Sequence, residues 1–206
     1  DRPGLGEDVA WAESNAIVFV NSVLGARTAR YGDFSDVAAA IAGCVPYAGL
    51  HRPEARLARL IVELDPDTAG YLVDESDLGA LGLAVGELAA GRVPAIVGLP
   101  QGTTEDALKA LGAAAASSGS VAMFHAVGVT PEAPTLEAAI ASDREPARCG
   151  VNAADLRRAA ASLATAPDGP IDAVALGTPH FSVSEFERLH AYLGETQERV
   201  RVEFTV

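Results

Sequence analysis

The chain has 206 residues, which is enough for one sizeable globular domain or two small ones. Hydrophobic residues make up 49% of it and aromatic residues only 5%, so we expect a core of small and aliphatic side chains. The formal net charge of −13, from 28 acidic and 15 basic residues, repels phosphate backbones and anionic lipid surfaces. Nucleic acid is therefore not an expected partner.

No stretch of the sequence reaches the 18 or more apolar residues that a membrane span requires, and the N-terminus has no signal-peptide pattern. We therefore expect a cytoplasmic protein without a membrane partner. Two cysteines are too few for a disulfide framework in a chain of this length, and reduced thiols are compatible with a metal site.

Apolar patterning in the first half of the chain predicts helices at residues 12–25 and Ser35–Ala42, the second ended by Gly43 and capped by Asp33 or Ser35. A strand is predicted within residues 56–64, and a helix follows at about residues 76–90.

The second half repeats one unit, in which a short apolar strand leads through a glycine turn into an amphipathic helix. The three units are residues 95–116, residues 121–127 with a helix from Leu136, and residues 173–193. A further helix is predicted at 153–163 and a terminal strand at 199–206. Apolar strands that alternate with helices predict an α/β fold, with a parallel sheet covered by helices on both faces. The turns at Gly98, Gly128 and Gly177 would then share the carboxyl edge. We treat residues 1–206 as one domain, with a pair of α/β lobes as the alternative.

Polar side chains are concentrated in residues 6–28, a segment otherwise apolar enough to be core. They are Glu13, Ser14, Asn15, Asn21, Ser22, Arg27 and Thr28. Burying each neutral group without a partner costs roughly 1–3 kcal/mol, and a charged group costs more. These groups must therefore pair with one another or hold a ligand, which predicts a buried polar pocket.

The same segment closely resembles the signature of the aconitase X family, iron-dependent dehydratases that are distantly related to aconitase. The resemblance rests on GEDVAWAESNA at residues 6–16, NSVLGART at 21–28, RYGD at 30–33, residues 43–51, and LGTPHFS at 176–182. Residues 52–170 match only as generic alternating elements. The resemblance implies a portion of a larger catalytic α/β domain. The small swivelling domain that carries the base in aconitase relatives has no equivalent in this chain.

Cys44, after a helix-ending glycine, and Cys149, in the segment ARCG, are predicted to lie in loops and to converge on iron. The resemblance implies an iron–sulfur cluster, with 2Fe-2S favoured, or a mononuclear iron. A cluster usually takes three or four protein ligands, so a third would come from a segment or subunit outside this chain, which begins at Asp1 rather than methionine. Two unrelated thiols are the alternative.

Catalytic roles are expected for His180, in the strand-to-helix turn GTPH, and for Glu13 at the start of the first helix. A capping or core histidine is the alternative for His180. Arg27 is the expected carboxylate ligand, because its planar fork binds two oxygens. Other expected substrate contacts are Ser14, Asn15, Thr28 and Thr178. Ser14 or Asn15 would serve equally as a helix cap.

The remaining histidines are weaker candidates. His51 lies in the resembling region and is as compatible with a structural role as with a functional one. His125 is expected in the core and His190 on a helix surface. Asp8 and Ala29 replace residues typical of the family, so neither takes over the family's role. No glycine-rich nucleotide-binding motif is present.

The resemblance implies a hydro-lyase that eliminates water from a small hydroxy acid, with cis-3-hydroxy-L-proline as substrate and 1-pyrroline-2-carboxylate as eventual product. Branches acting on mevalonate 5-phosphate carry cysteine where Thr178 stands, which favours the hydroxyproline branch. We expect this chain to be inactive without the small swivelling domain or subunit and the missing N-terminal portion. Dehydration of another hydroxy acid, and a non-catalytic α/β module that binds a small acid, remain alternatives.

Overall fold

The computed structural model describes residues 2–32, 34–72, 74–141, 143, 145–177, 179–195 and 203–205. The chain divides into two compact units, residues 1–161 and residues 162–206. From the sequence we expected one domain over residues 1–206, with a pair of lobes as the alternative. The exposed stretch 164–172, which contains two prolines and a glycine, follows the boundary without helix or strand, and these residue types disfavour both.

The first unit begins with helices that the sequence predicted. Helix α1 (Ser14–Phe19) continues directly into a π-helix (Val20–Leu24), and together they match the expected helix at 12–25. Helix α2 (Ser35–Ala42) ends at Gly43 as expected, because Gly43 takes the left-handed conformation with φ of 68°. Its N-cap is Phe34, which makes no side-chain cap bond. A 3-10 turn (Gly49–His51) and α3 (Pro53–Arg56) lead towards the sheet.

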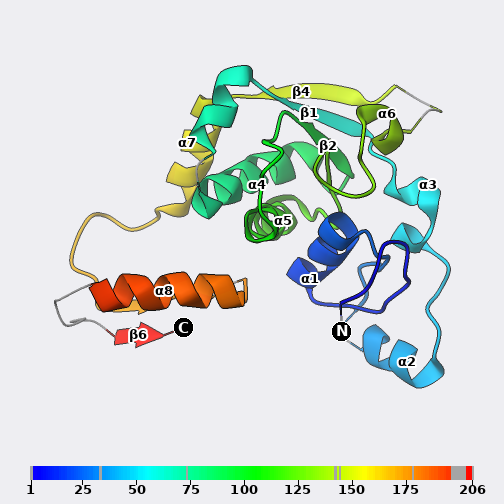
Figure 1. Cartoon of the computed structure of the whole chain (residues 1–206), viewed down its shortest axis with the longest axis horizontal. Coiled ribbons are helices and arrows are strands. Elements are labelled where there is room, and N and C mark those ends of the chain that lie inside the picture. The colour runs from blue at the N-terminus through cyan, green and yellow to red at the C-terminus, as the bar shows by residue number, and fades with distance from the viewer. Residues whose placement is uncertain are drawn as a thin grey trace. The chain divides into compact units, whose positions relative to one another are not determined.

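Four parallel strands form the sheet of this unit in the order β3-β2-β1-β4 (Figure 1). They are β1 (Leu60–Leu64), β2 (Pro94–Val97), β3 (His125–Ala126) and β4 (Ala147–Val151). A 3-10 helix (Pro66–Tyr71) and α4 (Glu75–Ala89) connect β1 to β2, α5 (Glu105–Gly119) connects β2 to β3, and α6 (Leu136–Ala139) connects β3 to β4. Helix α7 (Ala153–Leu163) follows β4. The predicted α/β class with a parallel sheet is confirmed.

The main core lies between this sheet and α4 and α5. Leu60, Val62 and Ile96 from the strands are buried against Leu81 and Leu111 from the two helices. Small residues let α4 and α5 approach closely: a Cβ added at Gly82 would lie 2.2 Å from the backbone oxygen of Leu111. The many small residues of this chain therefore allow α4 and α5 to pack closely against each other.

The second face of the sheet is covered less evenly. Four alanines, Ala58, Ala95, Ala133 and Ala139, form a small buried cluster there, and the last belongs to α6. Nearer β4 the same face reaches solvent, where Arg148 and Glu63 form an ion pair of 2.6 Å with half of each side chain exposed.

Two strands differ from the sequence-based expectation. The strand expected at 121–127 is reduced to the two residues of β3, and the expected loop around Cys149 is strand β4, in which Cys149 lies opposite Val62 of β1. The sequence ARCGV contains arginine and glycine and is therefore not an apolar run, which is why β4 was not predicted. As an edge strand, β4 needs only one buried face.

The second unit contains β5 (Ala173–Ala175) and β6 (Glu203–Thr205), which pair in parallel, and helix α8 (Val183–Glu195). Gly98 and Gly128 follow β2 and β3, whereas Gly177 follows β5. The three glycine turns therefore do not share one sheet edge, and that expectation is wrong, because β5 belongs to a separate sheet.

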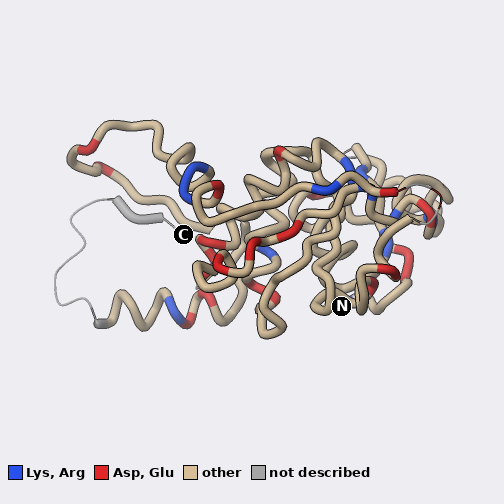
Figure 2. Tube along the Cα trace, turned by 90° about the horizontal axis from the view of Figure 1, so that it is seen from above, with Lys and Arg blue, Asp and Glu red and all other residues tan. Residues whose placement is uncertain are grey.

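Acidic positions recur along much of the trace, consistent with the net charge of −13 (Figure 2). Among the described residues, no helix has both the length and the apolar character that crossing a bilayer requires.

Candidate functional site

The polar segment at residues 6–28 folds back on itself. Asp8 and Arg27 form a parallel β-bridge, and the Val9 amide donates to the Arg27 carbonyl at 2.9 Å. Beside this bridge, the Trp11 amide donates to the Thr28 hydroxyl and that hydroxyl donates to the Trp11 carbonyl, both at 3.1 Å. These bonds bring the residues before α1 next to the residues after the π-helix, so the two halves of the polar segment do lie together.

A buried arginine, Arg56, is hydrogen-bonded to several groups of this region. Its side chain is 2% exposed and donates to the carbonyls of Asn21, Ala26 and Leu50 at 2.9–3.0 Å, and to the carboxylate of Glu132. Of the polar groups predicted to be buried, Asn21 and Thr28 bond to each other, whereas Glu13 and Ser14 are exposed, so burial was wrongly expected for these two. The role of Arg56 was not predicted from the sequence. Its only sign there is the position of a charged residue beside an apolar run.

Asn21 and Ser22 are part of the same buried network. The Asn21 side chain accepts from Arg56 at 2.9 Å and donates to the Thr28 carbonyl at 3.0 Å. The Ser22 hydroxyl accepts from the Phe124 amide at 2.9 Å. These two residues satisfy groups of the fold and have a structural role.

Next to the network, three side chains form a hydrogen-bonded row. Asp8 Oδ1 lies 2.7 Å from His51 Nδ1, and His51 Nε2 contacts the hydroxyl of Tyr31. His51 is 1% exposed, whereas half of the Asp8 side chain is exposed. From the sequence alone the role of His51 stayed open and Asp8 had no expected role, because residues 8, 31 and 51 are too far apart in sequence for spacing to reveal the group.

The environment of Tyr31 disfavours the ionised form of its phenol. Partial burial raises the pKa of Tyr31 above its ordinary value of 10.0, and the negative charge of Asp8 raises it further. At neutral pH the phenolic proton is therefore present, and it is available to the imidazole of His51.

Two buried polar atoms of the predicted substrate residues have no hydrogen-bond partner among the described residues. They are Asn15 Oδ1, in the first turn of α1, and Arg27 Nε, beside the Asp8 bridge. An unpaired buried polar atom costs about 1–3 kcal/mol, so each is a position where a ligand would restore the lost bond. One atom is an acceptor and the other is a donor.

The other predicted contacts of this segment are already used within the fold. The Glu13 carboxylate caps α1 by accepting from the amides of Asn15 and Ala16 at 2.9 and 2.8 Å, so these N–H groups are not free for a ligand. Ser14 is exposed and lies 3.4 Å from Glu13 Oε1. Thr28 is fully buried and its hydroxyl is bonded twice to Trp11, which gives it a structural position rather than the expected substrate contact.

The two thiols are held on separate elements. Cys44 is exposed and follows the end of α2, whereas Cys149 lies within β4, at a distance from α2 in Figure 1. The Cys149 thiol donates to the Ile61 carbonyl at 3.6 Å, and burial raises its pKa. Within the part of the chain that the structure describes, neither thiol belongs to a group of three potential metal ligands. The structure therefore does not bring the two cysteines together, and they do not form one iron site by themselves.

His180 is exposed and lies in the second unit, between β5 and α8. Thr178 falls outside the described residues. His125 is buried as expected, and its Nε2 donates to the Arg56 carbonyl at 2.8 Å.

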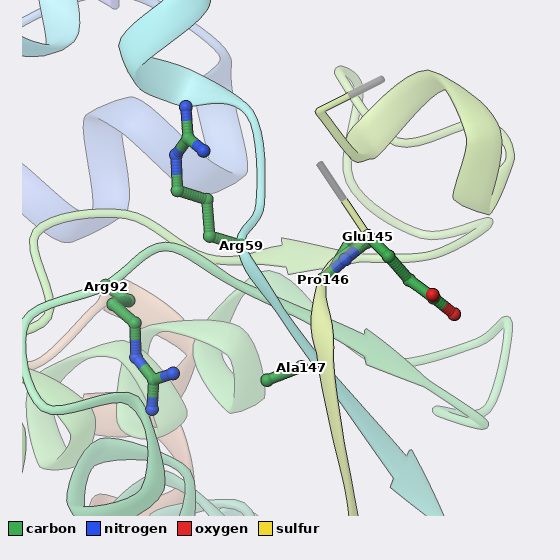
Figure 3. Close-up of a pocket in the computed structure, with 5 residues that line it drawn as sticks. All are labelled: Arg59, Arg92, Glu145, Pro146 and Ala147. Atoms are coloured by element: carbon green, nitrogen blue, oxygen red, sulfur yellow. The ribbon is translucent and has the colours of Figure 1, made fainter. Parts of the chain in front are cut away.

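A pocket of about 430 Å³ lies at the amino edge of the sheet, lined by Arg59, Arg92, Glu145, Pro146 and Ala147 (Figure 3). None of the predicted site residues lines it. The guanidinium groups of Arg59 and Arg92 point in different directions, and Arg92 is bonded to the carbonyls of Leu88 and Ala89 at the end of α4. This pocket therefore lacks the converging cations that a phosphate group requires.

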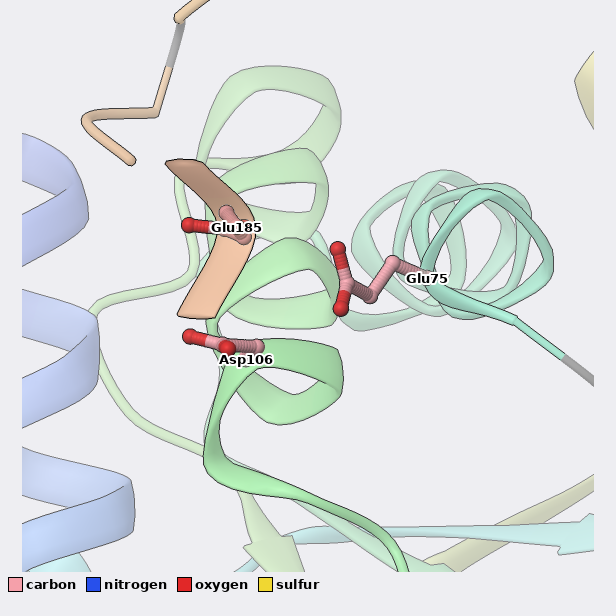
Figure 4. A group of neighbouring side chains, drawn as sticks. All are labelled: Glu75, Asp106 and Glu185. Carbon is pink, nitrogen blue, oxygen red and sulfur yellow. The ribbon is translucent and has the colours of Figure 1, made fainter. Parts of the chain in front are cut away.

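Glu75 and Asp106, at the beginnings of α4 and α5, each bring a carboxylate oxygen within 4.8 Å of the other (Figure 4). Carboxylates in the first turn of a helix are favoured by the helix dipole. The acidic pair is thus accounted for by helix stability.

Two family models match the first unit. The model of the aconitase X first domain matches residues 1–54, and that of the aconitase X second domain matches residues 58–161. The two matches leave residues 55–57 between them, and Arg56 at the end of α3 is one of these residues.

Similar proteins extend over nearly the whole chain. It is 47% identical to a cis-3-hydroxy-L-proline dehydratase of Pseudomonas aeruginosa over 192 residues, which is 93% of this chain and 33% of the relative. A protein of the same name from Hypocrea jecorina is also 47% identical, over 91% of this chain and 32% of the relative. The phosphomevalonate dehydratase large subunit of Methanothermobacter thermautotrophicus is 43% identical, over 93% of this chain and 45% of the relative. The chain thus spans about a third to a half of the length of these relatives.

The fold agrees with a solved structure. The crystal structure of the holo-form of aconitase X from Thermococcus kodakaraensis superposes with a TM-score of 0.86 at 33% sequence identity. The match covers 99% of this chain and 50% of that chain.

Proposed function

Because the chain belongs to the aconitase X family, we propose that it is part of a hydro-lyase that eliminates water from cis-3-hydroxy-L-proline. The proposed substrate rests on the 47% identity to two cis-3-hydroxy-L-proline dehydratases over more than nine-tenths of the chain. The five phosphomevalonate dehydratase large subunits are 36–44% identical. The eventual product would be 1-pyrroline-2-carboxylate.

The unpaired atoms of the first unit support this substrate. Arg27 Nε is a donor and fits the carboxylate of an amino acid, and Asn15 Oδ1 is an acceptor that fits the ring ammonium or the hydroxyl group. The Trp11–Thr28 bonds join the segments that carry them. In this proposal Arg27 and Asn15 orient the substrate, while Glu13 acts as a helix cap rather than as a catalytic group.

Mevalonate 5-phosphate is the second candidate, because the 43% identity to a phosphomevalonate dehydratase large subunit extends over 93% of the chain. A phosphate-bearing substrate would need a basic pocket. The residues of the Arg59–Arg92 pocket do not supply one, since Arg92 is engaged with backbone carbonyls and Arg59 lies 3.7 Å from Asp143. The geometry supports the amino acid over the phosphate ester.

The whole reaction needs more than this chain. The holo-form of the solved relative implies a cofactor, and we propose iron, as a 2Fe-2S cluster or a single ion. The thiols of this chain do not fit a shared site. Cys44 is the accessible thiol and would supply one ligand, and the remaining polypeptide would supply the others. The rest of the enzyme, including a small swivelling domain or subunit, would complete the site, and His180 remains a catalytic candidate there.

The test is dehydration of cis-3-hydroxy-L-proline and of mevalonate 5-phosphate by the complete enzyme. Arg27→Gln should raise KM for hydroxyproline about 10- to 100-fold, because a charge-assisted hydrogen bond contributes about 1.5–3 kcal/mol. Arg148→Gln is the matched control, since Arg148 is paired with Glu63 on the exposed face of the sheet. Turnover of mevalonate 5-phosphate alone would select the second candidate. Turnover of neither would leave the non-catalytic small-acid-binding module as the better reading.

A further inference from the structure

Residues 32–49, which contain α2, form a long loop whose two ends meet. Tyr31, directly before the segment, contacts His51, which follows the segment after one residue. Asp8 Oδ1 lies 2.7 Å from Nδ1 of the same histidine. His51 is 1% exposed, so this closure belongs to the interior of the first unit. The hydrogen-bonded row of Asp8, His51 and Tyr31 thus fixes the base of the segment.

Beyond this base the segment exposes large apolar side chains. None of its described residues is buried. Phe34, Val37 and Ile41 share one face of α2 and its N-cap, because steps of three and four residues bring side chains to the same side of a helix. Phe34 and Ile41 are 85% exposed, Val37 is 54% exposed, and Tyr47 beyond α2 is 73% exposed. Several such side chains together, rather than one alone, are typical of a binding surface.

Helix α2 is too short to be stable without packing. It has eight residues, whereas helices below about 12–15 residues are marginal in water unless tertiary contacts cover one face. Its N-cap makes no side-chain cap bond, and α2 contains no buried residue. The segment therefore needs an apolar contact that the described residues of this chain do not supply.

We propose that Phe34, Val37, Ile41 and Tyr47 form a docking surface for the part of the complete enzyme that lies outside residues 1–206. The proposal rests on that part of the proposed function which makes this chain a portion of a longer enzyme, and it names the surface that holds the rest of it. The chain covers 33% and 32% of the two cis-3-hydroxy-L-proline dehydratases, so most of such an enzyme lies outside the matched region and is available to cover this face.

Charge disfavours the other occupants. Residues 32–49 contain two aspartates but no lysine or arginine, so α2 lacks the basic residues by which an interfacial helix binds anionic lipid. The chain carries a formal net charge of −13, and two copies of it repel each other. The remaining polypeptide of the same enzyme is therefore the occupant that the composition favours.

The proposed docking surface includes the surroundings of the exposed thiol. Cys44 follows Gly43, the C-cap of α2, and precedes Tyr47 by three residues. A polypeptide that covers α2 would therefore also approach Cys44, which agrees with the proposal that the rest of the enzyme supplies further iron ligands.

The first experiment uses photo-crosslinking in the complete enzyme. The photoreactive amino acid p-benzoylphenylalanine replaces Ile41, and irradiation should join this position to a peptide outside residues 1–206, which mass spectrometry of the digest identifies. The matched control carries the same amino acid in place of Glu87, an exposed residue of α4, and should give far less of that product.

The second experiment measures cleavage of the complete enzyme by chymotrypsin, which cuts after aromatic residues such as Phe34 and Tyr47. Ile41→Asp places a charge on the docking surface and should speed cleavage at both sites about 10- to 100-fold, because cleavage follows the population in which the segment is uncovered. Ile41→Leu keeps the surface apolar and should be cleaved like the unmodified enzyme. Position 41 is exposed in this chain, so neither substitution disturbs the interior of the first unit.

The outcomes separate the docking surface from the function. Crosslinking of position 41 to a second copy, only within residues 1–206, or no more strongly than position 87 would overturn the docking surface. Equal cleavage of Ile41→Asp and the unmodified enzyme would do the same, as would protection of Phe34 and Tyr47 only when anionic lipid vesicles are present. Neither readout measures dehydration. An enzyme that crosslinks as expected but dehydrates neither substrate would overturn the function and leave the docking surface standing.

Discussion

The guanidinium of Arg56 meets the carboxylate of Glu132 through two nitrogens, with Nε 3.0 and 2.9 Å from Oε1 and Oε2 and Nη2 2.6 Å from Oε1. Arg56 is 2% exposed, so its charge depends on this partner and on the surrounding carbonyls. Glu132→Ala should lower the free energy of unfolding by about 3–5 kcal/mol, because it leaves a buried charge uncompensated. Urea unfolding measures the loss.

Glu63→Ala is the control for Glu132→Ala. Glu63 also pairs with an arginine, at 2.6 Å, but half of each side chain is exposed. An exposed ion pair contributes about 0–1 kcal/mol. Equal losses in the two variants would mean that burial of Arg56 does not determine the contribution of its partner.

His125 should make the protein sensitive to mild acid. Burial lowers the pKa of His125, and although its bond to the Arg56 carbonyl and the charge of Glu132 oppose this, the positive charge of Arg56 adds to it. Its Nδ1 is buried without a partner among the described residues. Protonation at Nδ1 would therefore create a buried, charged N–H group with no hydrogen-bond acceptor among those residues. A depressed pKa stabilises the fold above the unfolded value of about 6.5, and this stability is lost as pH falls through the folded value. His125→Asn should flatten the dependence of the urea midpoint on pH below about 6.5, and an unchanged slope would contradict the assignment.

The glycines of α4 offer a matched pair of substitutions. Gly82→Ala should destabilise the protein by about 1–3 kcal/mol, because the new Cβ would lie 2.2 Å from the backbone oxygen of Leu111. Gly79→Ala in the same helix meets no atom within 4 Å, and should stabilise by about 0.5–1 kcal/mol through helix propensity alone. Thermal unfolding of both variants gives the comparison, in which shifts of the same sign would show that α4 and α5 can move apart.

The two thiols should react at different rates. Cys44 is exposed, whereas the Cys149 thiol is half-buried in β4 and its pKa is raised by burial. In the 206-residue chain, a disulfide reagent at neutral pH should therefore label Cys44 first, as judged by comparing Cys44→Ser with Cys149→Ser. In the complete enzyme Cys44→Ser should lower iron content and Cys149→Ser should not. Loss of iron in both variants would instead support the shared site expected from the sequence.

The helices and strands with clear local signals could be predicted from the sequence. Helix α7 was expected at 153–163 and lies at Ala153–Leu163, and α4 and α5 begin within one residue of the expected positions. Their apolar periodicity, together with caps such as Thr104, is a property of neighbouring residues. Strand β4 was missed because its pairing with β1, 87 residues earlier at Leu60 and Ala147, decides its conformation.

The candidate site was only partly predictable for the same reason. The polar composition of residues 6–28 indicated that the two halves of this segment meet, which the Trp11–Thr28 bonds bear out, but Glu13 and Ser14 are exposed, and Arg27 and Asn15 retain unpaired atoms. Composition could not show that Thr28 and Glu13 are used by the fold itself, or that Asp8, Tyr31 and His51 meet. Those relations depend on tertiary contacts between segments that are up to 43 residues apart.

Synthesis of the chain from its N-terminus imposes an order on the Arg56 network. The carbonyls of Asn21, Ala26 and Leu50 are all made before Arg56, whereas Glu132 follows it by 76 residues. At a translation rate of about 5–20 residues per second, Glu132 is synthesised roughly 4–15 s after Arg56. The hydrogen bonds between Arg56, the segment that matches the first domain of the family and Glu132 therefore cannot all form while the nascent chain is still short. The set is complete only after most of the second domain has been translated.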